Sequence, residues 1–133
     1  MKVQFLLACT EESQTNQLVP FIEQRGWQVA ITRTGAEALM QIERILPFIS
    51  IVDVSLPDTT GWDVLEEVRQ NPVVHELFVM LVYPVGAVIE DFFRGWRSGV
   101  DMSFVTPLDP LEVVFYLARS VEAWREYLPD VQQ

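Results

Sequence analysis

Acidic side chains that could do chemistry follow two of the apolar runs in this sequence. Asp53 ends the run Phe48–Asp53 and opens the stretch DVSLPDTTG, which contains Pro57 and Gly61. A carboxylate at the end of a buried run could bind a hard cation or act as a nucleophile, or it could only cap a loop. The polar residues that follow the first apolar run are Cys9, Thr10, Glu11 and Glu12.

Five short apolar runs alternate with helical patterns and predict β-strands. We expect strands at Val3–Ala8, Trp27–Thr32, Phe48–Asp53, Phe78–Tyr83 and Ser103–Val105. Four of the runs are nearly continuous, which is typical of strands covered on both faces, whereas Trp27–Thr32 alternates like a half-covered edge strand. Five β–α units predict an α/β fold, a doubly wound five-stranded parallel sheet with helices on both faces.

In an open parallel sheet, ligands bind beyond the carboxyl ends of the strands, where the strand order reverses. If the order is 2-1-3-4-5, the ends of the first and third strands border one crevice. Asp53 and the residues after Ala8 would then lie together. At helix ends, Thr34 with Glu37 is spaced as a capping box, and Asp109 precedes Pro110 as a cap.

The composition limits the classes of protein that fit. The 133 residues carry a net charge of −10, which argues against binding nucleic acid or an anionic membrane surface. Cys9 is the one cysteine, so no internal disulfide can form, which fits a reducing compartment. The N-terminal apolar run is too short to span a bilayer and lacks a signal-peptide pattern. We expect a soluble, cytoplasmic protein with one domain over residues 1–128 and a C-terminal tail over 129–133.

Other candidate residues favour a structural role. His75, the one histidine, lacks partners for a triad or a zinc site, and Cys9 is read as a small buried residue rather than a redox thiol. Asp58 suits a turn better than a second acid beside Asp53. Neither a glycine-rich phosphate loop nor a nucleophile–base pair is present, so a small enzyme on this type of fold has little support.

The stretch DVSLPDTTG resembles the phospho-acceptor motif of bacterial response-regulator receiver domains, the CheY-like family. The shared features are the Asp, the pair Leu56–Pro57 and a Gly eight positions after the Asp. The resemblance covers residues 3–122 and implies a flavodoxin-like sheet of order 2-1-3-4-5 and a cis bond between Thr106 and Pro107. Further similar stretches are Arg25–Val29, Thr34–Leu39 and Ser98–Pro110.

In that family the Asp accepts a phosphoryl group from a sensor kinase, assisted by Mg²⁺ that an acidic pair, the Asp and a backbone carbonyl hold, and by a Lys and a Ser or Thr. Carried over, Asp53 is the acceptor and Ser55 supplies the carbonyl. The other family positions are occupied by different residue types. They are Cys9 and Thr10 for the acidic pair, Tyr83 for the Ser or Thr, Thr106 for the Lys and Ser103 for the aromatic switch residue.

These departures predict a degenerate, non-enzymatic pseudo-receiver. Asp53 with Glu11 makes a poor Mg²⁺ site, because Mg²⁺ requires several well-placed oxygens, and Thr106 supplies no positive charge. Tyr83 is bulkier than Thr and is expected to fill part of the pocket. We expect weak or no phosphorylation of Asp53 and a two-component signalling role through protein contacts. The alternative is a working Asp53 phospho-acceptor, with Glu11 or Glu12 in the metal site and a partner that supplies the missing cation.

The fourth and fifth predicted helices carry more apolar residues than one buried face needs. In the last helix we expect Leu111, Val114, Phe115, Ala118 and Val121 to face the sheet. Exposed aromatic residues commonly mark a protein interface. In the family this surface contacts partners, here a sensor kinase, a downstream regulator or a second copy of the chain. The predicted interface residues are Phe92, Phe93, Trp96, Val113 and Tyr116.

Overall fold

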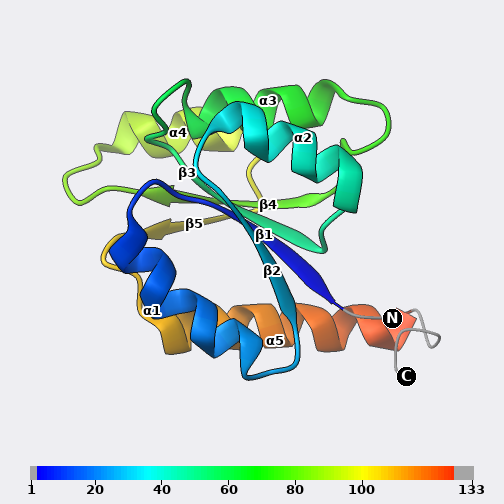
Figure 1. The fold of residues 1–133 in the computed structure, drawn as a ribbon. Helices are drawn as coiled ribbons and strands as arrows, with labels where there is room; N and C mark the ends of the chain where they lie inside the picture. Colours follow the sequence, from blue (N-terminus) through cyan, green and yellow to red (C-terminus); the bar gives the residue numbers. More distant parts are fainter. Residues whose placement is uncertain (1–2, 128–133) are drawn as a thin grey trace.

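A computed structural model describes residues 3–127, which form one parallel sheet between two layers of helices (Figure 1). The strand order is β2-β1-β3-β4-β5 and every pairing is parallel, which confirms the predicted fold. The predicted tail at 129–133 lies outside the described residues. In chain order the elements are β1 (Gln4–Ala8), α1 (Glu12–Glu23), β2 (Gln28–Thr32), α2 (Gly35–Ile45), β3 (Ile49–Asp53), α3 (Gly61–Gln70), β4 (Phe78–Tyr83), α4 (Ile89–Arg97), β5 (Met102–Val105) and α5 (Pro110–Tyr127).

Each face of the sheet is covered by its own set of helices, α1 and α5 on one side and α2, α3 and α4 on the other (Figure 1). Successive residues of the inner strands alternate between the two cores. Ile51 of β3 packs on the α1–α5 side, and its neighbour Val52 packs on the α2–α3 side. β2 lies at one edge, where Ile31 is 40% exposed, as expected for a half-covered strand.

The predicted helix boundaries are formed by the expected caps. The Thr34 hydroxyl accepts a hydrogen bond from Glu37 N at 3.1 Å, so α2 begins directly after it. The Asp109 carboxylate accepts one from Leu111 N at 3.0 Å, and Pro110 is the first residue of α5. The peptide bond between Thr106 and Pro107 is cis, as the family resemblance implied.

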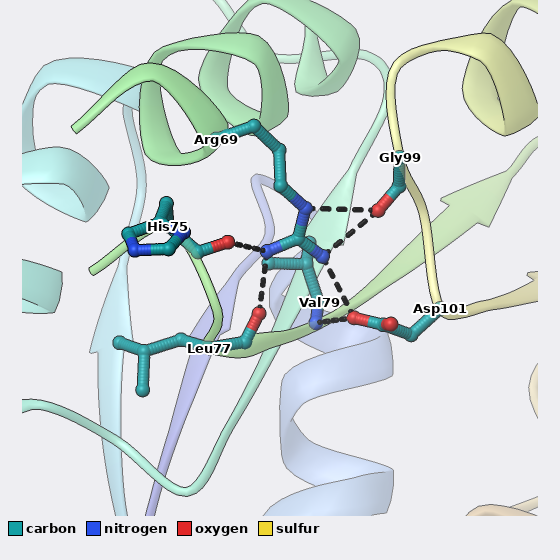
Figure 2. Close-up of polar contacts among 6 residues, drawn as sticks. All are labelled: Arg69, His75, Leu77, Val79, Gly99 and Asp101. Carbon is teal, nitrogen blue, oxygen red and sulfur yellow. Dashed lines mark hydrogen bonds and ion pairs between the residues drawn. The ribbon is translucent and has the colours of Figure 1, made fainter. Parts of the chain in front are cut away.

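Arg69 joins the end of α3 to the strands β4 and β5 (Figure 2). Its guanidinium donates to the carbonyls of Gly99, His75 and Leu77 and to the carboxylate of Asp101, at 2.6–3.0 Å. The same Asp101 oxygen accepts from Val79 N. The side chain of His75 is solvent-exposed, as expected for a loop residue. This cluster fixes the amino ends of β4 and β5, at the edge of the sheet opposite Asp53.

The expected orientation of the last helix is only partly right: Val114 and Val121 are buried as predicted, at 8% and 1% exposed. Leu111 and Phe115, predicted to face the sheet, are 67% and 57% exposed, whereas Val113 is 1% exposed. Val113 packs with Leu117 and Val121 in the core on the α1–α5 side, because the spacing of four residues places all three on one stripe of the helix. Val113 is therefore removed from the predicted interface.

No helix within the described residues is long and apolar enough to cross a membrane.

Candidate functional site

Asp53 is the last residue of β3, at the carboxyl edge of the sheet. Val52 pairs with Ala8 of β1, and Asp53 pairs with Val82 of β4, so three strand ends border the carboxylate. Its Oδ1 accepts a hydrogen bond from Ser55 N at 2.9 Å. Asp53 as a whole is partly buried. The expected placement of Asp53 at a crevice of the sheet is consistent with this geometry.

Gly61, eight residues after Asp53, packs directly against the backbone of Asp53, which explains why a glycine is needed at this spacing. A Cβ at Gly61 would lie 2.6 Å from the backbone oxygen of Asp53 and 2.8 Å from Cα of Val54, distances that no side chain tolerates. Gly61 N also donates to Val54 O at 3.0 Å, and Ser55 bridges to Thr60. The segment after Asp53 therefore folds back onto its own strand, and α3 begins there.

Cys9 lies beside Asp53 in a small pocket between β1, β3 and α1. The thiol Sγ is 3.9 Å from Asp53 Oδ2 and 3.6 Å from the carbonyl of Glu11, and its single proton can serve one of these acceptors at a time. Burial raises the pKa of Cys9, and the negative charges of Asp53 and Glu11 add to this effect. The thiol therefore stays protonated, which makes it a weak donor rather than a nucleophile.

The pKa of Asp53 is raised, mainly by burial and further by the charge of Glu11. The hydrogen bonds from Ser55 N and Cys9 oppose this rise. Among the described residues that act on the carboxylate, none is basic. A basic side chain beside the carboxylate would lower its pKa, so Asp53 has no fixed positive partner among residues 3–127.

Arg33 is a basic residue at this crevice that sequence reasoning missed. It follows β2, and its Nη1 donates to the carbonyl of Cys9 at 2.9 Å and to the hydroxyl of Thr15 at 3.0 Å. The carboxyl ends of β1 and β2 are adjacent, so a residue directly after β2 could have been expected there. Arg33 holds the segment between β1 and α1, and it contributes no hydrogen bond to Asp53.

The other residues that occupy active-site positions of the receiver family are spread around the strand ends. Thr10 and Glu11 are exposed, and Glu11 Oε2 accepts from Gln14 Nε2 at 2.8 Å. Thr106 is partly exposed, and its N–H donates to the carbonyl of Tyr83 at 2.8 Å, while Ser103 is exposed on β5. Within residues 3–127, no group of three His, Cys, Asp or Glu side chains is placed to hold a metal ion.

Tyr83 does not fill the pocket beside Asp53, contrary to expectation. Side chains alternate along β4, so Val82 points to the α1–α5 side with that pocket and Tyr83 points to the other side. Its ring is fully buried and packs against Trp62 and Phe92, with ring centroids 6.0 and 4.3 Å away. Burial raises the pKa of the Tyr83 hydroxyl, which stays neutral.

Asp58 caps a helix and does not join Asp53. Its two carboxylate oxygens accept hydrogen bonds from Gly35 N at 2.8 Å and Ala36 N at 3.0 Å, at the start of α2. These bonds lower the pKa of Asp58. A Cβ at Gly35 would lie 2.2 Å from Cγ2 of Thr59, so the segment after Asp53 packs closely on α2. The reading of Asp58 as a turn residue was thus incomplete.

Most predicted interface residues of α4 and α5 reach the surface. Trp96 is 72% exposed, Phe93 44% and Tyr116 36%, whereas Phe92 is half-buried against Tyr83. The edge strand β5 lies between these helices in sequence, and its Val105 is also exposed. We call the following exposed set the α4–β5–α5 surface. It consists of Ile89, Phe93, Trp96, Val105, Leu111, Phe115 and Tyr116.

Comparisons with known proteins agree with the fold. An uncharacterized 14.6 kDa protein of Leptolyngbya boryana is 30% identical over 110 residues, which cover 82% of this chain and 83% of that protein. The DNA-binding response regulator MtrA of Mycolicibacterium paratuberculosis is 27% identical over 114 residues, or 86% of this chain and 49% of MtrA. The chain thus spans about half the length of this regulator. No family model matches the chain.

A solved structure shows the same fold. The CheY-like response regulator receiver domain protein of Methanospirillum hungatei superposes with a TM-score of 0.84 at 19% identity, covering 96% of this chain and 99% of that one. The chain belongs to the CheY-like response-regulator receiver domains. It is a receiver domain of the two-component type.

The Asp58 cap predicts an acid-dependent stability difference. The pKa of Asp58 is below its ordinary value of 3.8 in the folded chain, so the carboxylate stabilises the fold above that value, and this contribution is lost as the pH falls through the lowered pKa. We expect Asp58→Asn to lower the melting temperature at pH 7 and to differ less from wild type at pH 3. Thermal unfolding at both pH values measures this, and an equal difference at both would contradict the cap.

Proposed function

We propose that this receiver domain acts through protein–protein contact and that Asp53 is phosphorylated weakly or not at all. The observation that carries the proposal is the environment of Asp53, where a protonated thiol at 3.9 Å and the charge of Glu11 replace the cations that phosphoryl transfer requires. A carboxylate can approach an anionic phosphoryl group only when fixed positive charge offsets the repulsion. None of the described residues acting on Asp53 supplies that charge.

The donor set does not fit Mg²⁺. Mg²⁺ prefers carboxylate and carbonyl oxygens in octahedral geometry, whereas the side chains at the family's acidic positions are a thiol and the exposed hydroxyl of Thr10. Glu11 contributes charge near Asp53, but its carboxylate is engaged by Gln14. No step of the proposed function therefore uses a metal ion. The partner-assisted alternative, with Asp53 as a working acceptor, requires Glu11 or Glu12 to change its position.

The α4–β5–α5 surface supports the contact role. Its exposed aromatic side chains form pairs, Phe93 with Trp96 and Phe115 with Tyr116, with ring centroids 6.5 and 5.8 Å apart. Apolar side chains left in water on three consecutive elements are typical of a surface that a protein covers. We propose that a sensor kinase or a downstream regulator binds here; a second copy of the chain is the other outcome that experiment can reveal.

The phosphorylation proposal predicts little or no acyl phosphate on the wild-type chain. After incubation with acetyl phosphate and Mg²⁺, intact mass spectrometry should show at most a minor phosphoryl adduct on wild type and none on Asp53→Asn. The variant Cys9→Asp, Thr10→Asp, Thr106→Lys restores the family's oxygens and cation and should gain an adduct that is lost on adding Asp53→Asn. An adduct on most of the wild-type chain that Asp53→Asn abolishes would establish the working acceptor instead.

The contact proposal predicts that a charge on the surface weakens binding without unfolding the chain. Phe93→Glu and Tyr116→Glu should reduce partner capture, or the dimer fraction measured by light scattering, at least tenfold, as expected for buried interface anchors. Met40→Glu is the matched control, because Met40 is 63% exposed on α2, on a different helix. Unchanged capture and unchanged oligomeric mass in both surface variants would exclude this surface.

A further inference from the structure

Tyr83 connects the segment after Asp53 to α4 through two hydrogen bonds. The indole Nε1 of Trp62, in the first turn of α3, donates to the Tyr83 hydroxyl at 3.2 Å. The same hydroxyl donates to the backbone carbonyl of Asp91 in α4, also at 3.2 Å. Trp62 follows Gly61, which lies directly against the backbone of Asp53. A fully buried phenol thus links α3, β4 and α4.

The shape of α4 is adapted to this hydroxyl. A Cβ at Gly95 would lie 2.2 Å from the Tyr83 hydroxyl, 3.2 Å from Cδ1 of Leu81 and 3.5 Å from Cζ of Tyr83. Gly95 is the one residue of α4 that is buried, and Phe92 packs against the Tyr83 ring at a centroid distance of 4.3 Å. The absence of a side chain at Gly95 therefore lets the helix rest on the phenol oxygen.

The remaining contacts of α4 are lateral and partly exposed. Arg94 stacks over the Trp62 ring at 4.4 Å and forms an ion pair with Asp63 at 3.6 Å. Exposed ion pairs contribute little to stability. A helix with one buried residue has few apolar contacts to hold it, so the Tyr83 hydroxyl has a large share in its position.

We propose that Tyr83 is the positioning residue that holds α4, and with it Phe93 and Trp96, in the orientation that the α4–β5–α5 surface needs. The hydroxyl, rather than the ring alone, carries this role, because it accepts from Trp62, donates to α4 and fills the space that Gly95 leaves. The importance of the surface rests on the proposed function, but the anchor itself can be measured without a partner or phosphate.

A double-mutant cycle tests the contact between Tyr83 and Gly95. Gly95→Ala in the wild-type chain places a methyl group against the hydroxyl and should lower the melting temperature by about 5 °C or more. In the Tyr83→Phe background the hydroxyl is gone, and the same change should have no effect or raise the melting temperature, because Ala is the better helix former. An equal effect of Gly95→Ala in both backgrounds would overturn the proposal.

Hydrogen exchange of the full chain tests the anchoring of α4. Tyr83→Phe should speed the exchange of the α4 amides about tenfold, through the loss of buried hydrogen bonds, while the amides of β1 and β3 change little. The Trp62 indole resonance, identified with Trp62→Phe, should shift in the same variant. Tyr116→Phe is the control and should leave both readouts unchanged.

Two results would contradict the anchor. Unchanged α4 exchange in Tyr83→Phe would show that the hydroxyl does not hold the helix, and a uniform acceleration over all elements would reduce Tyr83 to a general core residue. Either result leaves the phosphorylation test of Asp53 unaffected, so failure of the anchor and failure of the proposed function can be told apart.

Discussion

The charge of Asp53, at the end of a buried parallel strand, constrains the chemistry that this crevice can carry out. The sheet brings the ends of β1, β3 and β4 together, so the carboxylate shares its crevice with whatever follows β1. Here that residue is Cys9, and burial and the charge of Glu11 raise the pKa of Asp53. No described basic residue acts on this carboxylate, and that absence is the reason we propose surface contacts rather than phosphoryl chemistry.

The strands and helix caps could be predicted from the sequence because each of them is determined by a few neighbouring residues. The five strands, their order and the caps at Thr34 and Asp109 agree with the structure. Continuous apolar runs indicated buried strands, and the family resemblance supplied the order and the cis bond before Pro107. The place of Asp53 at a strand end followed from the same pattern, since only the residue type and the end of the run were needed.

The direction in which a side chain points from its helix or strand could not be predicted in the same way. In α5, apolar residues surround the helix, so helical spacing alone does not define the buried face, which includes Val113 and Val114 but leaves Phe115 exposed. In β4 the apolar run is buried on both faces, so the sequence could not show that Tyr83 points to α4 rather than to the Asp53 pocket. The contacts of Arg33 with Cys9 and Thr15 join segments that are distant in the sequence, and hydrophobic patterns do not predict such contacts.

The protonation of Asp53 with and without Mg²⁺ shows whether the crevice holds a cation. A carbon-detected NMR titration of the Asp53 carboxyl group would report its pKa in the intact chain, with Asp53→Asn used to assign the signal. We expect a pKa of Asp53 above the ordinary 3.8 that millimolar Mg²⁺ leaves unchanged. A pKa that falls on addition of Mg²⁺ would show that the crevice holds the cation, and it would contradict the reading of this site as one without a counter-charge.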